Sequence, residues 1–302
     1  MEREKSKDLI CLVRERTVLF DGAMGTMLIA EGLSGGEISE RWNLDKPDMV
    51  KAIHRRYFEA GCDVALTNTF GANRSKLKKK NLEREVFQFN TLAAKLAKGV
   101  NPGDRFVAGD IGPSGELIAP DGNLTAHEME GIFAEQAEAL DSEKVDLILI
   151  ETMFSLQEAV AALKGVRTVS QCPVFVSMTY EKKDRGYFTL MGETPEVCSK
   201  TLEDEGADVV GANCTIGSKG MIPLARILRD STTLPVIVQP NAGNPQLKDG
   251  KTIYEQDSED FAEDMEAIVR IGVNAVGGCC GTTPEFISAV CKRILDDPPP
   301  RT

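Results

Sequence analysis

The sequence is short of the residue types on which many enzyme sites depend. It contains two histidines and one tryptophan, and aromatic residues make up only 6% of its 302 residues. Both histidines, His54 and His127, lie in stretches with helical periodicity, where we expect them to face solvent. A histidine-based metal site and a Ser-His-Asp triad are therefore disfavoured. No Cys-x-x-Cys motif occurs either, which argues against thiol–disulfide exchange.

The sequence also lacks a long apolar run and an excess of positive charge. Its first residues, MEREKSKD, are charged and contain no apolar core of a signal peptide. No later run approaches the roughly 20 apolar residues of a membrane span. The net charge of −12 disfavours nucleic acid as a partner. Eight cysteines without the dense spacing of a small secreted domain favour reduced thiols or metal ligands. We therefore expect a cytoplasmic protein that binds neither membrane nor nucleic acid.

One pattern repeats along the whole chain. Short runs rich in Val, Ile, Leu and Ala alternate with longer amphipathic stretches, which is typical of a parallel sheet with crossover helices. Eight such runs are present, at 17–20, 63–68, 106–111, 146–152, 173–179, 207–214, 235–241 and 274–280. The count predicts a single (β/α)₈ barrel over residues 14–295. An N-terminal extension or helix (1–13) would precede the barrel, and a proline-rich linker or terminus (296–302) would follow it.

Residues that typically begin and end helices support this count of strands. Pro47 begins a helical stretch that Gly61 ends, and Thr194-Pro195 begins another that Gly206 ends. Thr283-Pro284 begins the last helix. These signals place a helix between successive strands.

In a (β/α)₈ barrel the chemistry lies at the carboxyl ends of the strands. Nearly every predicted strand here ends in a polar or thiol side chain: Asp21, Asn68, Asp110, Glu151, Thr179, Cys214, Asn241, and Cys279 with Cys280. A barrel closed only for packing would not need such a ring. We therefore expect a binding or catalytic site at this end.

The most informative stretch is Gly277-Gly278-Cys279-Cys280-Gly281. Adjacent cysteines rarely form a disulfide with each other, whereas two thiolates in a flexible glycine-rich loop can bind a metal. Cys214, at the end of another predicted strand, is the candidate third ligand. Three thiolates on Zn²⁺ leave a charge of −1, which makes a poor site for hydrolysis but suits activation of a thiol substrate. Cys214, Cys279 and Cys280 are therefore the candidate metal ligands and catalytic residues.

Other interpretations of these cysteines stay open. Taken alone, Cys214 is more often a buried packing residue than a ligand. The three thiols could also form a closed structural zinc site, or Cys279 and Cys280 could act in redox chemistry. The other five cysteines (Cys11, Cys62, Cys172, Cys198 and Cys291) have no such context and are interpreted as packing residues. The lysine-rich run 76–80 is interpreted as a solvated face, with docking of an acidic partner as the alternative.

Six motifs together resemble the homocysteine S-methyltransferase family, and within it the N-terminal homocysteine-binding module of cobalamin-dependent methionine synthases. They are FDGAMGT (20–26), TNTFGAN (67–73), GDIGP (109–113), NC (213–214), PNAG (240–243) and GGCCGTTP (277–284). The resemblance extends over nearly the whole chain, and the cysteine-pair motif is the most specific part of it.

The resemblance implies a zinc ion held by Cys214, Cys279 and Cys280, with the sulfur of L-homocysteine as fourth ligand. The methyl donor it implies is methylcobalamin on a corrinoid (cobalamin-binding) domain or protein. The chain contains no folate or corrinoid module. The chain is therefore expected to be either a fragment that ends at the proline-rich linker, or a standalone methyltransferase that uses S-methylmethionine, betaine, another small donor or a separate corrinoid protein.

The amino-acid end of the substrate needs its own contacts. The glycine-rich turn at Gly22, Ala23 and Met24 offers backbone N–H groups for a carboxylate. Asp21 and Glu151 are the candidates for the ammonium group, with helix capping as the alternative role.

Three asparagines complete the predicted site: Asn68, Asn213 and Asn241. Asparagine is also a common turn former, so a structural role is the alternative for each. For Asn241 the hypothesis is that its oxygen fills the open zinc position, or orients the site, when homocysteine is absent.

Overall fold

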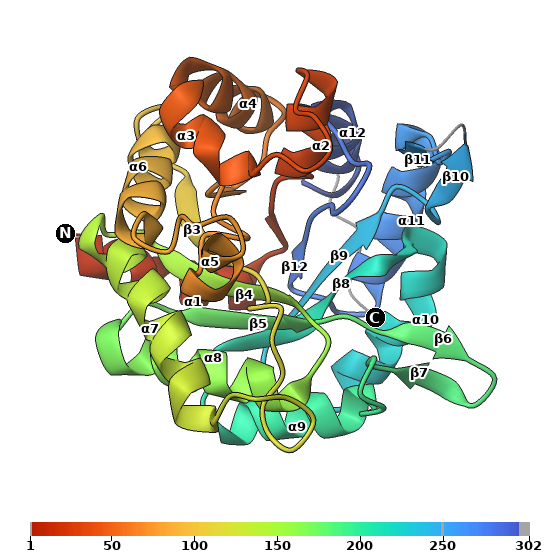
Figure 1. The fold of residues 1–302 in the computed structure, drawn as a ribbon. Coiled ribbons are helices and arrows are strands. Elements are labelled where there is room, and N and C mark those ends of the chain that lie inside the picture. The colour runs from red at the N-terminus through yellow and green to blue at the C-terminus, as the bar shows by residue number, and fades with distance from the viewer. Residues whose placement is uncertain (1, 249–250, 296–302) are drawn as a thin grey trace.

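The computed structural model describes residues 2–248 and 251–295, in which eight parallel strands form a barrel (Figure 1). The strands are β1 (Val18–Leu19), β2 (Val64–Leu66), β3 (Phe106–Ile111), β4 (Leu147–Met153), β5 (Val174–Met178), β8 (Val209–Gly217), β9 (Val236–Asn241) and β12 (Ala275–Val276). They pair in the order β1-β12-β9-β8-β5-β4-β3-β2, and a parallel bridge between Phe20 and Val64 closes β1 onto β2. The predicted (β/α)₈ barrel is confirmed.

A helix follows every strand of the barrel. These helices are α4 (Pro47–Glu59), α6 (Val86–Lys98), α7 (Ala126–Ser142), α8 (Leu156–Val169), α9 (Pro195–Asp204), α10 (Ser218–Asp230), α11 (Ser258–Arg270) and α12 (Pro284–Ile294). Three of them begin at the predicted prolines, because proline at the first helical position lacks an N–H group that would have no partner there. A capping box between Thr125 and Glu128 begins α7.

Two strands differ from their predicted extents by more than two residues at their carboxyl ends. β12 pairs only at Ala275 and Val276, so Gly277 to Cys280 run in a loop beyond the ladder. β8 continues to Gly217, with a shift of register between Asn213 and Gly217 against β9. Both differences fall at the cysteines, where the chain leaves regular pairing.

The remaining helices and hairpins lie outside the eight strand–helix units of the barrel. They are α1 (Glu2–Glu15), α2 (Met24–Ala30), the 3₁₀ turn η1 (Ser39–Arg41), α3 (Trp42–Asp45), α5 (Arg74–Lys78), the hairpin β6 (Glu181–Lys183)–β7 (Gly186–Phe188), and the hairpin β10 (Gln246–Lys248)–β11 (Lys251–Ile253). Leu9 and Val13 of α1 are fully buried against residues that line the barrel, so α1 covers its amino-terminal end. Residues 296–302 lie outside the described part, and the predicted linker stays a prediction. No described helix is both long and apolar enough to cross a membrane.

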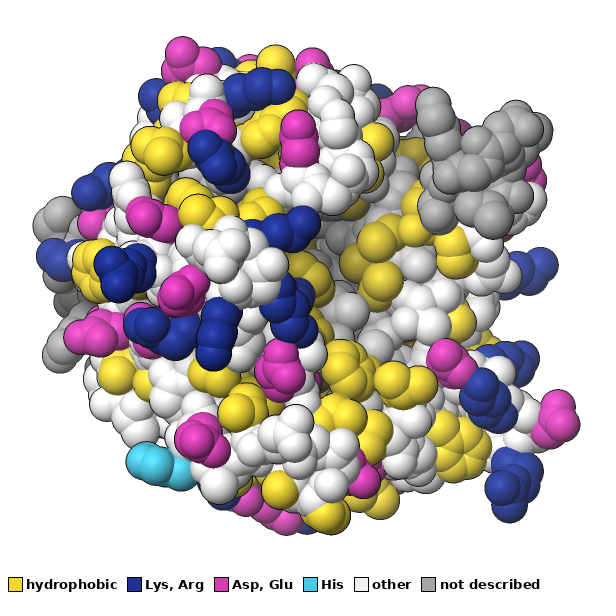
Figure 2. All heavy atoms as spheres, in the orientation of Figure 1, with side chains coloured by type: hydrophobic (Ala, Val, Ile, Leu, Met, Phe, Trp, Pro, Cys, Tyr) yellow, Lys and Arg dark blue, Asp and Glu magenta, His cyan; other side chains and the backbone are white. Residues whose placement is uncertain are grey.

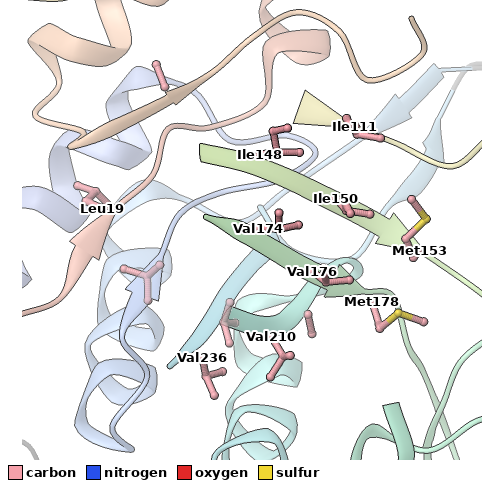
Figure 3. Close-up of a cluster of buried hydrophobic side chains, with 14 of the residues drawn as sticks. Leu19, Ile111, Ile148, Ile150, Met153, Val174, Val176, Met178, Val210 and Val236 are labelled. Carbon is pink, nitrogen blue, oxygen red and sulfur yellow. The ribbon is translucent and has the colours of Figure 1, made fainter. Parts of the chain in front are cut away.

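Side chains alternate between two apolar clusters along the strands. One cluster fills the barrel and includes Phe106, Leu147, Val209 and Ile237. The other lies between the strands and the helices and includes Leu19, Ile148, Ile150, Val174, Val176 and Val236 (Figure 3). Because successive residues of a strand point to opposite faces, every second residue faces the barrel axis. This alternation decides which side chains reach the site.

Two sequence-based interpretations of side chains on α1 and α4 are wrong. His54 does not face solvent: it is fully buried in α4, and neither ring nitrogen has a hydrogen-bond partner among the described residues. Cys11 is exposed and is not a packing residue. In both cases the helical stretch is amphipathic, but neighbouring elements decide which of its faces is covered.

Burial lowers the pKa of His54 to about 4. In the unfolded chain this imidazole binds a proton near pH 6.5, so its contribution to stability is full above that pH and is lost as the pH falls toward 4. We expect the loss to reach roughly 3 kcal/mol. His54→Leu should remove this component, which urea unfolding of both proteins at several pH values between 7 and 4 would measure. Parallel stability curves for the two proteins would contradict the assignment.

Candidate active site

Polar side chains form a layer above the apolar filling of the barrel. Ala108, Leu149 and Ile237 belong to the inner cluster. Two residues further along β3 and β4 the same face carries Asp110 and Glu151, and later inward positions on β8, β9 and the loop after β12 carry Asn213, Asn241 and Cys279. In Figure 2 this face of the molecule is hollowed. The predicted location of the site at the carboxyl ends of the strands agrees with this layer.

Three thiols converge in the polar layer. The sulfur atoms of Cys214, Cys279 and Cys280 all lie within 4.8 Å of one another, and those of Cys214 and Cys280 are 3.8 Å apart. Two sulfurs on a tetrahedral zinc with bonds of about 2.3 Å would be separated by about 3.8 Å. The three predicted ligands are therefore brought together at a spacing that suits a metal ion.

An unusual backbone conformation places Cys214. Cys214 and Thr215 have φ angles of 61° and 62°, in the left-handed region that non-glycine residues rarely adopt. They lie in the irregular part of β8 between Asn213 and Gly217. For a β-branched residue such as Thr215 this conformation is strained, and strain of this kind collects at functional sites. The irregularity lets the adjacent residues Asn213 and Cys214 both reach the site.

The loop that carries Cys279 and Cys280 is tied to its neighbours. Cys279 N–H donates to the Pro240 carbonyl (2.8 Å), and Ala242 N–H donates to the Cys280 carbonyl (3.0 Å). The Thr282 hydroxyl donates to the Cys279 carbonyl (2.7 Å). A Cβ on Gly278 would lie 2.3 Å from Thr282 Oγ1, so only glycine permits this approach. The glycines of the motif thus allow tight closure of the loop around the two thiols.

The three thiols cannot all lose their protons without a nearby cation. Hydrogen bonds from Cys214 and Cys279 lower the pKa of Cys280, whereas the hydrogen bonds of Cys279 with Cys214 and Cys280, together with burial, raise the pKa of Cys279. One negative charge is therefore favourable in this cluster, and further thiolates repel one another. A divalent cation would remove that repulsion.

Asn213 connects the thiols to Glu151. Its Oδ1 accepts from Thr152 N–H (2.8 Å) and the Ser177 hydroxyl (2.9 Å). Its Nδ2 donates to Glu151 Oε2 (3.1 Å) and lies 3.9 Å from the sulfur of Cys279. Because protein groups already engage both ends of this amide, its role in the structure is to hold the carboxylate and the thiol in place.

Asp21 and Glu151 are buried carboxylates. Leu66 N–H donates to Asp21 Oδ2 (2.9 Å), and burial raises the pKa of Asp21 well above its usual range. Burial, followed by the charge of Cys280, raises the pKa of Glu151 to about 8. Among the described residues, neither carboxylate has an ion pair with Lys, Arg or His. A cationic ligand would provide the missing partner.

The glycine-rich turn lies beside the thiol loop. Thr282 accepts the N–H of Ala23 through both its carbonyl (3.3 Å) and its hydroxyl (3.2 Å), and the Tyr57 hydroxyl donates to the Ala23 carbonyl (3.2 Å). A Cβ on Gly22 would lie 2.8 Å from Thr282 Oγ1, so glycine is needed there. α2 begins at Met24, and the first N–H groups of a helix have no partner within it.

The remaining two asparagines differ in their surroundings. Asn68 is turned toward the rim of the barrel, where its Nδ2 donates to the Ser39 carbonyl (2.8 Å) and to Asn43 Oδ1 (3.0 Å). Asn241 is buried, and its Oδ1 has no hydrogen-bond partner among the described residues. Asn241 therefore has an oxygen available for a ligand.

Two residues at the site were not found by sequence reasoning. The ring of Tyr254, which follows β11, packs on Gly281, where a Cβ would lie 2.4 Å from its Cγ. Its hydroxyl is close enough to Cys280 to lower the pKa of that thiol. No local pattern marks Tyr254, because the hairpin that carries it meets the cysteine loop only in the fold.

Lys76 is the second residue at the site that sequence reasoning did not find. Its predicted place on a solvated face is wrong, because the side chain is half-buried and its Nζ lies 4.3 Å from the centre of the Phe70 ring. Burial lowers the pKa of Lys76, against the opposing charges of Glu40, Asp110 and Glu158. Lys78, Lys79 and Lys80 are exposed as predicted. Lys and Arg side chains border the hollow over α5 in Figure 2.

The fold and the site together define a (β/α)₈ barrel with a three-thiol cluster at the carboxyl ends of its strands. The sequence model of the family "Homocysteine S-methyltransferase" matches residues 18–294. This chain belongs to the homocysteine S-methyltransferase family, as the motifs predicted.

Individual relatives agree with this assignment. The chain is 33% identical to methionine synthases of Mycobacterium leprae and Mycobacterium tuberculosis, over 97% and 96% of its length. It spans only about a quarter of those relatives, namely 26% and 25%. The metallated homocysteine methyltransferase MmuM of Escherichia coli has the same fold, with a TM-score of 0.79, 22% identity, and coverage of 96% of this chain and 99% of that one.

Proposed function

We propose that this chain is a zinc-dependent homocysteine S-methyltransferase that converts L-homocysteine to methionine. The observation that carries the proposal is the convergence of Cys214, Cys279 and Cys280 at a spacing suited to zinc. When bound, zinc would lower the pKa of a substrate thiol, so that the sulfur is a thiolate at neutral pH. The thiol would lose its proton to solvent, and its sulfur would use an electron pair to bond the methyl group while the methyl–donor bond breaks and its electron pair stays with the donor.

The chain's own residues would hold the amino-acid end of the substrate. Asp21 and Glu151 lack a cationic partner among the described residues, which supports a role in binding the ammonium group. Of the predicted N–H groups at Gly22, Ala23 and Met24, those of Gly22 and Met24 would receive the carboxylate, because Thr282 already accepts the N–H of Ala23. Asn213 would act by holding Glu151 beside Cys279. Asn68 would act by holding the rim of the site.

Methylcobalamin on a corrinoid domain or protein is the proposed methyl donor. The support is the similarity to methionine synthases, of which this chain spans only about a quarter (26% and 25%). A small donor such as S-methylmethionine or betaine is the second candidate, because MmuM, a homocysteine methyltransferase, matches over nearly its whole length. We propose the cytoplasm as the location of the reaction.

Zinc content and zinc-edge X-ray absorption, recorded with and without L-homocysteine, test the proposal. We expect one zinc per chain, bound by three sulfurs and one lighter atom, and a change to four sulfurs when homocysteine is added. If the number of sulfur ligands on zinc stays the same when homocysteine is added, the site would be a structural zinc site. Absence of zinc, with a reaction that depends on oxidation of the thiols, would indicate redox chemistry.

Asn241 gives a prediction of its own. Its buried and unpartnered Oδ1 supports the hypothesis that it supplies the lighter atom, or orients the site, before substrate binds. Asn241→Ala should weaken zinc binding by roughly 10-fold or more, as measured by competition with a chromophoric chelator. Unchanged zinc coordination together with unchanged homocysteine affinity would remove this hypothesis.

A further inference from the structure

Asp110 lies inside the barrel, in the same polar layer as Glu151. Phe106 and Ala108 precede it on the inward face of β3 and belong to the cluster that fills the barrel. Its backbone is fixed from both sides: Asp110 N–H donates to Thr67 Oγ1 (3.0 Å), and the Thr69 hydroxyl donates to the Asp110 carbonyl (2.6 Å). The alternation along β3 therefore places the Asp110 side chain on the inward face of the strand.

The carboxylate of Asp110 has fewer hydrogen-bond partners than the carboxylates of Asp21 and Glu151. Asp110 is 5% exposed, and its Oδ1 is buried with no hydrogen-bond partner among the described residues. By contrast, Leu66 N–H bonds to Asp21 and the Asn213 amide bonds to Glu151. A buried carboxylate without partners is costly unless a cation or a proton joins it.

No Lys, Arg or His side chain in the described part of the chain forms an ion pair with Asp110. The ion pairs at 4.0 Å or less between described side chains do not include Asp110. Lys76 faces it only at longer range, with its Nζ over the ring of Phe70. Burial, together with the nearby charges of Glu151 and Asp21, raises the pKa of Asp110 well above its usual range. The three carboxylates are therefore close enough to influence one another, and Lys76 acts on Asp110 only from beyond the distance of an ion pair.

We infer that Asp110 is a third acceptor for the ammonium group of an amino-acid substrate, beside Asp21 and Glu151, and selects thiols that carry a free α-amino group. An ammonium group has three N–H donors, which three carboxylates from β3, β4 and the end of β1 could each receive. The inference rests on the proposed function, because it assigns the amino group of homocysteine to these three carboxylates.

Binding calorimetry with the zinc-loaded chain tests the inference with two thiols. L-homocysteine carries the ammonium group, whereas 4-mercaptobutyrate has the same thiol and carboxylate without it. For Asp110→Asn we expect homocysteine to bind at least about 10-fold more weakly, because a charge-assisted hydrogen bond is lost. Binding of 4-mercaptobutyrate should change by less than about 3-fold. Asp110→Ser provides a second variant if Asp110→Asn does not fold.

Glu158→Gln is the matched control. Glu158 is also buried and faces Lys76, but it lies on α8, where its Oε1 accepts from the Ser114 N–H (2.7 Å) and hydroxyl (2.6 Å). This variant should bind both thiols as the wild type does.

The outcomes separate this inference from the proposed function. Equal losses for both thiols, or no loss for either, in a folded Asp110 variant would overturn the role of Asp110. Failure of the wild-type chain to bind either thiol would instead contradict the proposed function.

Discussion

Replacing Cys280 with serine is expected to remove both the metal and the activity of this protein. The sulfur of Cys280 lies 3.8 Å from that of Cys214 and within 4.8 Å of that of Cys279. A serine hydroxyl does not ionise at neutral pH and is a poor ligand for zinc. We expect zinc content to fall from one per chain to a small fraction, and methyl transfer to homocysteine to fall by roughly 10³-fold or more, about 4 kcal/mol in activation free energy.

Cys11→Ser is the control for this experiment, because Cys11 is an exposed thiol on α1. It should leave zinc content and activity unchanged. Metal content is measured by atomic emission, and the fold by circular dichroism. If Cys280→Ser keeps a full equivalent of zinc and its activity, the three-thiol site is not the catalytic centre.

The second large effect concerns the wall of the barrel. A Cβ added to Gly211 on β8 would lie 1.9 Å from the carbonyl oxygen of Ile237 and 2.6 Å from its Cγ2. Gly211 and Ile237 are paired in the sheet, so the backbone cannot move aside without disrupting the ladder between β8 and β9. Gly211→Ala should therefore lower the free energy of unfolding by about 3 kcal/mol or more.

Gly131→Ala gives the opposite expectation and serves as the matched control. Gly131 lies on an exposed face of α7, and a Cβ added there would meet no heavy atom of another element within 4 Å. Alanine should stabilise this helix by about 0.5–1 kcal/mol, because glycine loses more backbone entropy on folding. Urea unfolding measures both variants. A Gly211→Ala protein as stable as the wild type would show that the barrel wall can adapt at this point.

The location of the site could be predicted from local patterns. Apolar runs separated by helical stretches predicted all eight strands, and polar or thiol residues at their ends predicted the layer that contains Glu151 and Asn241. Cys214, Cys279 and Cys280 were named from their chemistry and their motifs, and they converge in the fold. The strands and the convergence of the thiols were predictable because strand alternation and barrel closure depend on patterns that are short in sequence.

The contacts that complete the site could not be predicted in this way. Asn213 bonds to Glu151, 62 residues away in the chain, and Tyr254 covers a glycine next to the cysteine pair only because a hairpin folds over it. The left-handed conformation of Cys214 depends on how β8 pairs with β9. Such details follow from packing between distant segments, which a local pattern does not contain.

The amino-acid sequence by itself determined the fold class, the polar end of the barrel and the three thiols that converge there. Only the tertiary structure decided which helix faces are covered, so that His54 is buried and Lys76 turns toward the site. It also decided that Asp110 keeps an unpartnered oxygen inside the barrel, among the residues that the structure describes. The physical reason is that hydrophobic periodicity indicates which residues share a face of a helix or strand. Whether those residues are buried, and which hydrogen-bond partners they have, depends on the elements that pack against that face.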